Sequence, residues 1–520
     1  MTTEARMPAG SPEPALDVEP SPDAFARTYN EGRPGIVWLR LVADLETPVS
    51  AMLKLSHGRP MSFLLESVEG GAVRGRYSII GLEPDVVWRA FGNRAEINTR
   101  PAQDASNFTV EPQPTLASLR ALLERSRIAL PPELPPMAAG VFGYMGYDTV
   151  RLVESLPDVP PDVLGVPDAI LIRPTTMVIF DGVKDEMTVA TSVFPQPGVS
   201  ASAAREDAVA RLARIVRDLD DPLPHTAPPW SPLEAPEPVS NTPPADFLAM
   251  VDRCKEYIAA GDAFQIVVSQ RFSAPFTLPA LSLYRALRRT NPSPFLFHLD
   301  FGDFALVGSS PEILVRARDG RVTIRPLAGT RRRGTTPEED RKLEAELTAD
   351  PKERAEHLML LDLGRNDVGR VARIGTVEVA SSFDVERYSQ VMHLSSTVNG
   401  DLDPRFDAID ALLAGFPAGT LSGAPKVRAM EIIDELEKEK RGPYAGCVGY
   451  FSADGNMDTC IVLRTALVKD GRMYVQAGAG IVADSVPSEE QNECVIKARA
   501  LFRAAEEAVR FAGRTRRGNS

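Results

Sequence analysis

Cysteine and histidine are scarce in this sequence of 520 residues, which contains only 4 of the first and 5 of the second. The cysteines form no CxxC pair and are too few for a disulfide framework, and no Cys/His cluster has the spacing of a zinc site. No apolar run approaches the ~20 residues that span a bilayer. The N-terminus is acidic and proline-rich, and it lacks the basic region and apolar core of a signal peptide. These absences predict a cytoplasmic protein.

Positive charge is also in short supply, with 58 Lys and Arg residues against 71 Asp and Glu residues and a net charge of −13. This balance argues against a general binder of nucleic acids or anionic membranes. The hydrophobic and charged fractions, 43% and 25%, are those of a soluble globular protein. The length is sufficient for two or more domains.

Proline-rich stretches divide the chain. Residues 1–24 are predicted to form a disordered tail, and residues 221–245 a linker between two helical runs. The division leaves an N-terminal segment at 25–220 and a C-terminal segment at 246–515, both close to typical domain sizes.

The two segments share a pattern. "IIGLEPDVVWRAFGNRAEI" begins at Ile79 and "LVGSSPEILVRARDGRVTI" at Leu306, and each follows a related apolar run, at 62–67 and 294–299. An ordinary strand–turn–strand unit met twice would explain this, since Gly and Pro punctuate most hairpins. A diverged internal duplication is the favoured explanation. It would allow chemistry in one half and regulation in the other.

The C-terminal segment mixes strand and helix patterns unevenly, which predicts an α+β fold with helices packed around β-sheets. Strands are predicted at 264–272, 304–309, 312–317, 460–468 and 473–482. Helices are predicted at 338–347, 351–368, 424–440 and 488–511.

Two pairs of glutamates occur at i, i+3 spacing on separate predicted helices: Glu353 with Glu356, and Glu490 with Glu493. Either pair alone is compatible with a solvated face on which Glu493 and Lys497 form an i, i+4 ion pair. Two such pairs beside apolar segments favour a shared Mg²⁺ site, since Mg²⁺ is held by a few carboxylates together with water and substrate oxygens.

Glycines mark two further candidate sites. Residues 419–423 precede a helix and could bind an anion, or Ser422 could simply cap that helix. Gly478 and Gly480 would let a ligand approach the backbone of a strand closely. His393 lies in a strand-like stretch, and a lone histidine there is more often a hydrogen-bonded core residue than a catalyst.

Five stretches, "PLAGTRRRG", "EHLMLLDLGRND", "GTLSGAPK", "GAGIV" and "EEQNECVIKA", occur in the order found in the chorismate-utilising enzymes, which the sequence therefore resembles. Within that family the motifs are most similar to those of the component I subunits of anthranilate synthases. In the N-terminal segment, "LLES" at 64–67 and "RYSIIG" at 76–81 resemble the regulatory region of those subunits.

The resemblance implies a role for each matching residue. The implied catalytic residues are Glu312, His393, Thr420 and Lys497. The implied chorismate-binding residues are Gly329, Thr330, Tyr444, Arg464, Gly478, Ala479 and Gly480. The implied Mg²⁺ ligands are Glu356 and Glu493, with Glu353 and Glu490 beside them directly or through water. The implied tryptophan feedback pocket contains Glu66, Ser67, Pro294, Phe295 and Leu296, although two buried strands would show the same pattern.

The chemistry suits these residue types. Chorismate is a dianion, so Arg464, Lys497 and Mg²⁺ would offset its charge. Glu312 would protonate the departing C4 hydroxyl as ammonia adds at C2. His393 is expected to take part in the pyruvate elimination that follows, with its proton-transfer role left open.

Two positions distinguish relatives in the family. Ala328 stands where aminodeoxychorismate synthases typically carry a nucleophilic lysine, and Gln265 stands where isochorismate and salicylate synthases carry a lysine that activates water. Both favour ammonia as the nucleophile. No glutaminase motif is present, so the expected partner is a glutamine amidotransferase subunit (component II) in a hetero-oligomer, with tryptophan as feedback inhibitor. The alternatives are aminodeoxychorismate synthase component I, an inactive amino-acid-sensing subunit, and an enzyme that releases aminodeoxyisochorismate.

Overall fold

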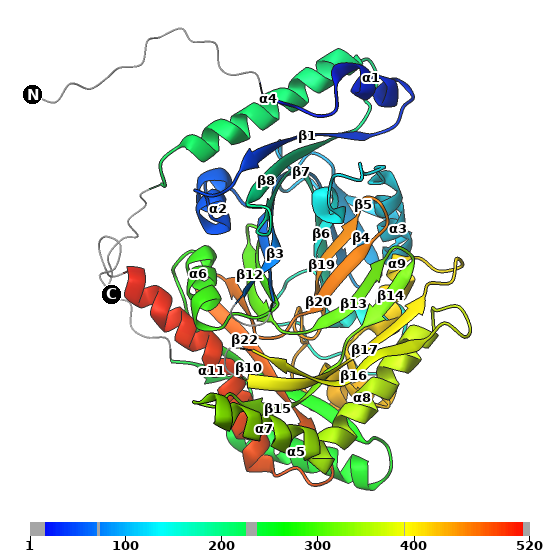
Figure 1. Cartoon of the computed structure of the whole chain (residues 1–520). Helices are drawn as coiled ribbons and strands as arrows, with labels where there is room; N and C mark the ends of the chain where they lie inside the picture. The colour runs from blue at the N-terminus through cyan, green and yellow to red at the C-terminus, as the bar shows by residue number, and fades with distance from the viewer. Residues whose placement is uncertain (1–15, 70–72, 225–236, 389–390, 513–520) are drawn as a thin grey trace, which may run out of the picture.

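In the computed structural model, residues 16–69, 73–224, 237–388 and 391–512 are described. Their 22 strands form one continuous, strongly curved sheet in which the pairings are antiparallel, and helices cover its outer faces (Figure 1). The predicted α+β class is therefore confirmed. Within these ranges, no helix is both long and apolar enough to cross a membrane.

The first half of the sheet is a run of ten strands joined edge to edge. In spatial order they are β1 (Gly35–Val42), β8 (Glu186–Val193), β7 (Ala169–Asp181), β3 (Val73–Phe91), β2 (Ser62–Glu69), β11 (Phe295–Asp300), β12 (Phe304–Ser310), β21 (Thr465–Lys469), β22 (Arg472–Ile481) and β10 (Gln265–Pro275). Short β9 (Val239–Ser240) and β18 (Gly423–Ala424) pair with β10.

The second half branches from β7. Its strands are β6 (Gly140–Met145), β19 (Cys447–Ser452), β20 (Met457–Ile461), β13 (Ile313–Arg318), β14 (Arg321–Ile324), β17 (Val391–Asp401), β15 (Leu327–Arg332) and β16 (Glu378–Arg387). A side branch of β3 adds β4 (Arg94–Asn98) and β5 (Thr109–Pro114).

Aromatic side chains fill the space between the two halves. The ring centroid of Phe142 on β6 lies 4.7 Å from that of Phe63 on β2 and 5.4 Å from that of Tyr450 on β19. These rings belong to one buried core cluster with Phe297 of β11. The two halves therefore stack face to face, as in other layered β structures.

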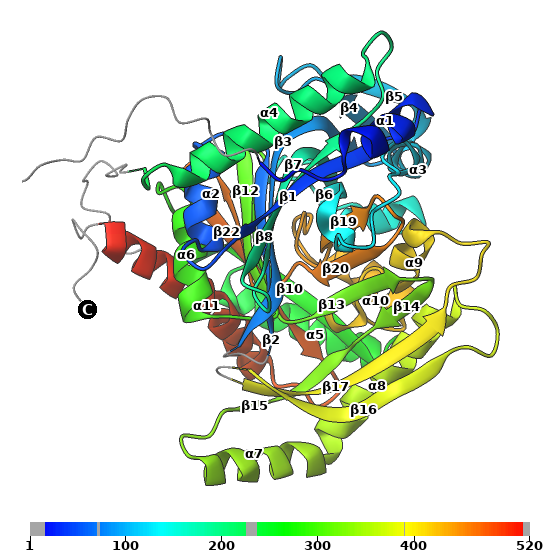
Figure 2. The same ribbon diagram turned by 45° about the horizontal axis from the view of Figure 1, so that its top comes forward.

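Helices cover the outer faces. The first half carries α1 (Pro22–Asn30), α2 (Pro48–Ser56), α4 (Ala201–Asp220), α6 (Ala280–Thr290) and α11 (Pro487–Ala512). The second half carries α3 (Thr115–Arg125), α8 (Pro351–Gly369) and α9 (Ala408–Gly415). Near β10 and β15 lie α5 (Pro244–Ala259), α7 (Pro337–Ala349) and α10 (Lys426–Leu436). Figure 2 shows α7 and α8 beside the β15–β16–β17 strands.

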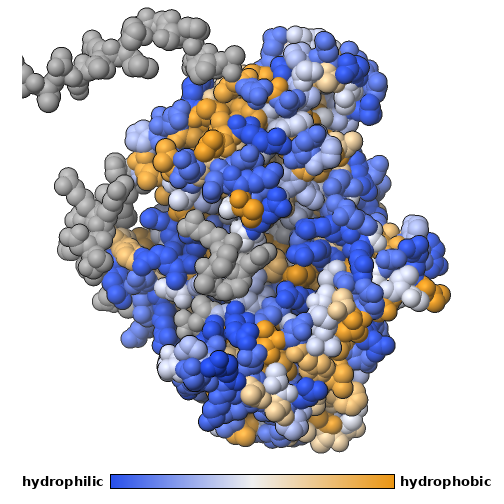
Figure 3. Space-filling model, in the orientation of Figure 1, coloured by the Kyte–Doolittle hydropathy of each residue, from blue (hydrophilic) through white to orange (hydrophobic). Residues whose placement is uncertain are grey.

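The face seen in Figure 3 is mostly hydrophilic, and apolar residues gather at its upper left, where β1 and α4 lie. The described ranges also contain three 3₁₀ helices: η1 (Pro136–Ala138), η2 (Tyr147–Leu152) and η3 (Gly419–Leu421).

The N-terminal and C-terminal segments share the sheet, because β2 pairs with β11 and β6 pairs with β19. The helix α1 begins at Pro22, within the last residues of the predicted tail. α4 ends at Asp220 and α5 begins at Pro244, and residues 225–236 of the predicted linker lie outside the described residues. The predicted domain bounds thus remain a prediction, with the strands of both segments interleaved.

The repeated sequence pattern has a structural parallel. A Cβ atom added to Gly81 would lie 2.2 Å from the ring of Phe63, and one added to Gly308 would lie 2.2 Å from the ring of Phe297. In both segments a glycine on one strand thus accepts a phenylalanine ring from the neighbouring strand. This parallel supports the internal duplication, which remains a hypothesis.

Candidate active site

A buried carboxyl group marks the turn between β12 and β13. Glu312 is 6% exposed, and its Oε1 atom accepts hydrogen bonds from the backbone N–H of Leu327 and the hydroxyl of Thr420, each at 3.3 Å. Burial raises the pKa of Glu312 to about 8, against the smaller opposing effect of these hydrogen bonds. At neutral pH this side chain is a neutral carboxylic acid, able to donate a proton.

A bulge in β15 holds the candidate histidine. Gly329 adopts φ +66°, which favours glycine, and its carbonyl oxygen lies 3.0 Å from Nδ1 of His393 on β17. The hydroxyl of Thr330 lies 3.1 Å from the same nitrogen. A carbonyl can only accept, so Nδ1 carries the hydrogen and Nε2 keeps its lone pair.

His393 is poised as a neutral base. Its Nε2 atom is buried and has no hydrogen-bond partner among the described residues. Burial, assisted by the charge of Arg464, lowers the pKa of His393 to about 4. The ring of Tyr388 lies beside it, with centroids 5.6 Å apart.

Arg464 interrupts the strand predicted at 460–468. β20 ends at Ile461 and β21 begins at Thr465, and Arg464 between them has φ +49°. Its guanidinium has no hydrogen-bond or ion-pair partner in the described part of the chain, and burial lowers its pKa. Arg464 and Glu312 nonetheless lie within electrostatic reach of each other. An unpaired, half-buried guanidinium is suited to a carboxylate ligand.

Glu353 and Glu356 lie in the first two turns of α8, whose N-terminus is well capped. Asp350 accepts hydrogen bonds from the N–H groups of Lys352 and Glu353, and Pro351 occupies the first position. Arg331 binds both Asp350 and Glu353 at 2.7 Å. Arg331 carries no predicted role, although the run of arginines directly after Thr330 in "GTRRRG" was a signal in the sequence.

The two glutamate pairs lie close enough to interact. Burial raises the pKa of Glu356, and the charges of Glu353 and Glu493 act in the same direction. Burial also raises the pKa of Glu490, and Glu493 again adds to the effect. Glu356 on α8 and Glu493 on α11 therefore lie within electrostatic range of each other, with 49% of the Glu493 side chain exposed, and a cation between them would relieve their repulsion.

The donor set fits a hard divalent cation, since it consists of carboxylate oxygens alone. Within the described ranges, no three acidic, histidine or cysteine side chains already stand in a metal-binding arrangement. Lys497 donates to Glu493 at 2.6 Å and to the carbonyl of Gly478 at 2.8 Å. The Mg²⁺ assignment remains a prediction.

The glycines of β22 make room for two larger side chains. A Cβ atom on Gly480 would lie 2.6 Å from Nε2 of Gln265, and one on Gly478 would lie 3.0 Å from the hydroxyl of Tyr444. Gln265 also donates to Glu356 at 3.4 Å. Ala479 is fully buried in the core between β10 and α10, so its side chain points away from this site.

Ser422, in the glycine loop before α10, does not cap that helix, so this alternative from the sequence is wrong. α10 begins at Lys426 after Pro425, without a side-chain cap, and the hydroxyl of Ser422 donates instead to the carbonyl of Ala418 at 2.9 Å. A Cβ atom on Gly419 would lie 2.2 Å from Leu363 of α8. The loop is therefore pressed against α8, which places Thr420 beside Glu312.

The residues implied for tryptophan binding lie together in the fold. β2 and β11 are adjacent, with Glu66 opposite Leu296 and Ser67 opposite Phe295, and Pro294 comes directly before β11. These five residues come from segments far apart in the sequence.

Polar contacts fix the two β2 residues of this group. Arg288 binds the buried Glu66 at 2.7 and 3.0 Å, and the hydroxyl of Tyr284 donates to it as well. The hydroxyl of Ser67 donates to the carbonyl of Tyr77 at 3.0 Å.

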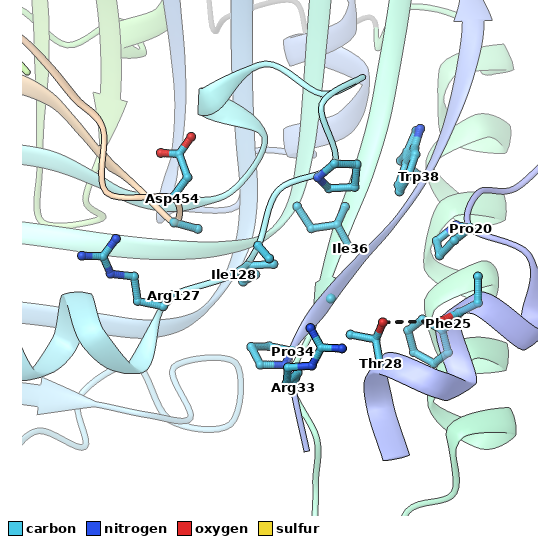
Figure 4. Close-up of a pocket in the computed structure, with 15 residues that line it drawn as sticks. Pro20, Phe25, Thr28, Arg33, Pro34, Ile36, Trp38, Arg127, Ile128 and Asp454 are labelled. Carbon is cyan, nitrogen blue, oxygen red and sulfur yellow. Dashed lines mark hydrogen bonds between the residues drawn. The ribbon is translucent and has the colours of Figure 1, made fainter. Parts of the chain in front are cut away.

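A surface groove of about 600 Å³ lies elsewhere, between α1, β1 and the segment that follows α3. Figure 4 shows Trp38, Ile36 and Ile128 on its walls, with Arg33 and Arg127 nearby. None of the residues singled out in the sequence lines it.

Comparisons with known proteins place these features in a family context. A family model described as chorismate binding enzyme matches residues 71–503. Anthranilate synthase component 1 of Cereibacter sphaeroides is 55% identical over 496 residues, covering 95% of this chain and 99% of that protein. The Pseudomonas putida protein of the same name is 49% identical, covering 89% and 93%. The crystal structure of anthranilate synthase component I from Streptococcus pneumoniae has a TM-score of 0.73 at 36% identity, covering 89% and 98%.

Proposed function

The chain belongs to the family of chorismate-binding enzymes, among the anthranilate synthase component 1 proteins, and we propose that it converts chorismate and ammonia into anthranilate and pyruvate. One observation carries the proposal: a neutral buried acid, Glu312, lies within electrostatic reach of Arg464, an arginine with no partner among the described residues. A dianionic substrate with a poor leaving group needs both.

In the first step Arg464 binds a carboxylate of chorismate through its two-pronged guanidinium, assisted by the positive charge of Lys497. Ammonia forms the C2–N bond, the ring double bonds shift, and the C4–O bond breaks. Glu312 donates its proton to the departing hydroxyl, which leaves as water. The ammonium group formed at C2 then loses one proton, which makes up for the proton that Glu312 donated.

In the second step the ring becomes aromatic. Nε2 of His393, with its free lone pair, accepts the proton from C2, the ring bond to the enolpyruvyl oxygen breaks, and one proton taken up at the methylene carbon of the released enolate gives pyruvate. Mg²⁺ held by Glu356 and Glu493, with Glu353 and Glu490 nearby, would offset the charge of the ring carboxylate.

Ammonia is proposed to come from glutamine through a separate amidotransferase subunit, component II, in a hetero-oligomer. Tryptophan is proposed to inhibit by binding at the site where the adjacent strands β2 and β11 bring Glu66 and Ser67 together with Pro294, Phe295 and Leu296. The close pairing of these strands supports the second idea.

The test is turnover of chorismate with ammonium and Mg²⁺, followed by anthranilate fluorescence, with and without EDTA. We expect fluorescence that EDTA abolishes and that the Glu312→Gln variant lacks. Mass spectrometry with chromatographic standards separates ortho- from para-aminobenzoate, and a para product would contradict the proposal. Ala328, which offers no amine on β15, favours the ortho product.

A further inference from the structure

A buried arginine, Arg441, lies close to the site, and its surroundings differ from those of the half-buried Arg464. Arg441 is 2% exposed and forms a double ion pair with Glu437, Nε to Oε2 at 3.0 Å and one terminal nitrogen to Oε1 at 2.6 Å. Its remaining terminal contacts go to the carbonyls of Leu421 and Val267, both at 2.7 Å. Arg441 therefore uses four of its five N–H donors, whereas the guanidinium of Arg464 has no partner among the described residues.

The partners of Arg441 adjoin residues of the proposed site. Leu421 directly follows Thr420, whose hydroxyl holds Glu312. Val267 lies on β10 directly opposite Gly480 of β22. Two backbone segments that carry site residues thus converge on one guanidinium.

Glu437, the ion-pair partner of Arg441, also bonds to β10. Its Oε1 atom also accepts from the N–H and hydroxyl of Ser269, both at 2.8 Å. Ser269 is the register partner of Gly478. The carboxylate thereby fixes the strand pair that presents Gly478.

Two aromatic rings lie near the guanidinium. The centre of its planar group lies 4.7 Å from the ring of Tyr147 and 5.6 Å from that of Tyr444. Cation–π attraction is stronger at such desolvated positions. Tyr444, an implied substrate-binding residue, is held by this stacking.

We propose that Arg441, paired with Glu437, is a positioning residue that holds the Thr420 loop, β10 and Tyr444 in register without touching substrate. A planar five-donor fork is needed for this, because lysine has one point of charge and cannot reach two carbonyls and a carboxylate at once. The proposal rests on the proposed function only for its kinetic readout.

The test compares Arg441→Lys with Arg151→Lys. Arg151 forms ion pairs with Asp148 and Asp434 at 2.8 and 2.7 Å, so it is a buried-pair control that contacts none of the three site segments. Hydrogen exchange of the peptide 416–424 is measured by mass spectrometry, together with the kinetics of the full chain.

Arg441→Lys is expected to speed exchange in 416–424 and to lower kcat about tenfold or more, since small misplacements of catalytic groups are costly. It is also expected to move the alkaline limb of the pH profile, because Thr420 bonds to Glu312. Arg151→Lys is expected to change thermal stability only. Equal exchange and equal kinetics in both variants would overturn the proposal.

The exchange measurement needs no turnover. Faster exchange in 416–424 together with no chorismate activity in the unmodified chain would leave the positioning role standing and refute the proposed function. Unchanged exchange in Arg441→Lys, together with chorismate activity in the unmodified chain, would refute the positioning role and leave the proposed function standing.

Discussion

The carbonyl oxygen of Gly329 accepts the Nδ1 hydrogen of His393 across 3.0 Å, and this contact decides which imidazole nitrogen is free. Gly329 can offer that carbonyl because its φ of +66° turns the peptide at the bulge between β15 and β17. Backbone conformation thus sets the tautomer, and the tautomer leaves Nε2 as the proton acceptor.

Replacing Gly329 tests whether its backbone geometry affects turnover beyond its effect on folding stability. Gly329→Ala is expected to lose about 1–2 kcal/mol from the left-handed conformation alone. Its new methyl would also lie 3.1 Å from Glu353 and 3.2 Å from Leu347, so the bulge would shift and turnover would fall. Unfolding curves and anthranilate fluorescence measure the two effects.

Gly320→Ala is the matched control for this substitution. Gly320 has φ +74°, and a Cβ atom there would meet nothing within 4 Å. It should lose similar stability while keeping full activity. Loss of activity in both variants to the same degree would show that the Gly329 carbonyl has no special role.

The pH dependence of turnover should have its alkaline limb near pH 8. Burial raises the pKa of Glu312 to about 8, so its proton is present at neutral pH and is lost as the pH rises through that value. His393, with its pKa lowered to about 4, stays neutral over the same range. A profile of kcat/KM that stays flat to well above the Glu312 pKa would rule out this carboxyl as the acid.

Glu312→Gln provides the matched check. It should reduce turnover by about 10²–10⁴-fold, the usual contribution of a general acid. The same substitution should alter the pH dependence of stability. The carboxyl ionises at about 4.5 in the unfolded chain and at about 8 in the folded one, so folding stability contributed by Glu312 declines between these values. Glu312→Gln removes that slope.

The sequence was informative where the signal is local. The helices predicted at 351–368 and 488–511 agree with α8 and α11 because a long 3.6-residue period depends on neighbouring residues alone. The strand predicted at 460–468 missed its interruption, because the apolar run hides the positive φ of Arg464. No local pattern states which distant strand a strand will join.

Long-range pairing therefore had to come from the structure. β2 and β11 lie side by side although they belong to different sequence segments, and Arg441 bonds to carbonyls on two other elements. The identities of the side chains do not show which backbone carbonyls an arginine will contact. The family motifs could thus name Thr420 and Tyr444, but not the arginine that holds both.

The proposed inhibitor pocket predicts a loss of regulation without a loss of catalysis. Ser67 lies against the backbone of β3, since a Cβ atom on Gly75 would come within 2.5 Å of it. Ser67→Phe needs space that is absent there, so we expect turnover to persist and tryptophan inhibition to disappear. Ser62→Ala, at the other end of β2 opposite Asp300, should remain inhibited. Tryptophan inhibition that is unchanged in Ser67→Phe would refute the pocket.

Magnesium dependence should reside in the glutamates of α8 and α11. The raised pKa of Glu356, caused first by burial and then by the charges of Glu353 and Glu493, indicates negative charge that lacks full compensation. Glu493→Gln removes one of these charges, so the Mg²⁺ concentration for half-maximal turnover should rise about tenfold or more. Isothermal titration with Mg²⁺ alone should show the same loss of affinity.

Glu489→Gln is the control for the metal prediction, since Glu489 is an exposed neighbour on the same helix and carries the same charge. It should leave the Mg²⁺ activation curve in place. High Mg²⁺ should restore part of the turnover of Glu493→Gln and none of that of Glu312→Gln, because only the first change acts through the cation. An identical Mg²⁺ curve for Glu493→Gln and the unmodified chain would place the metal elsewhere and leave Glu493 as the ion-pair partner of Lys497.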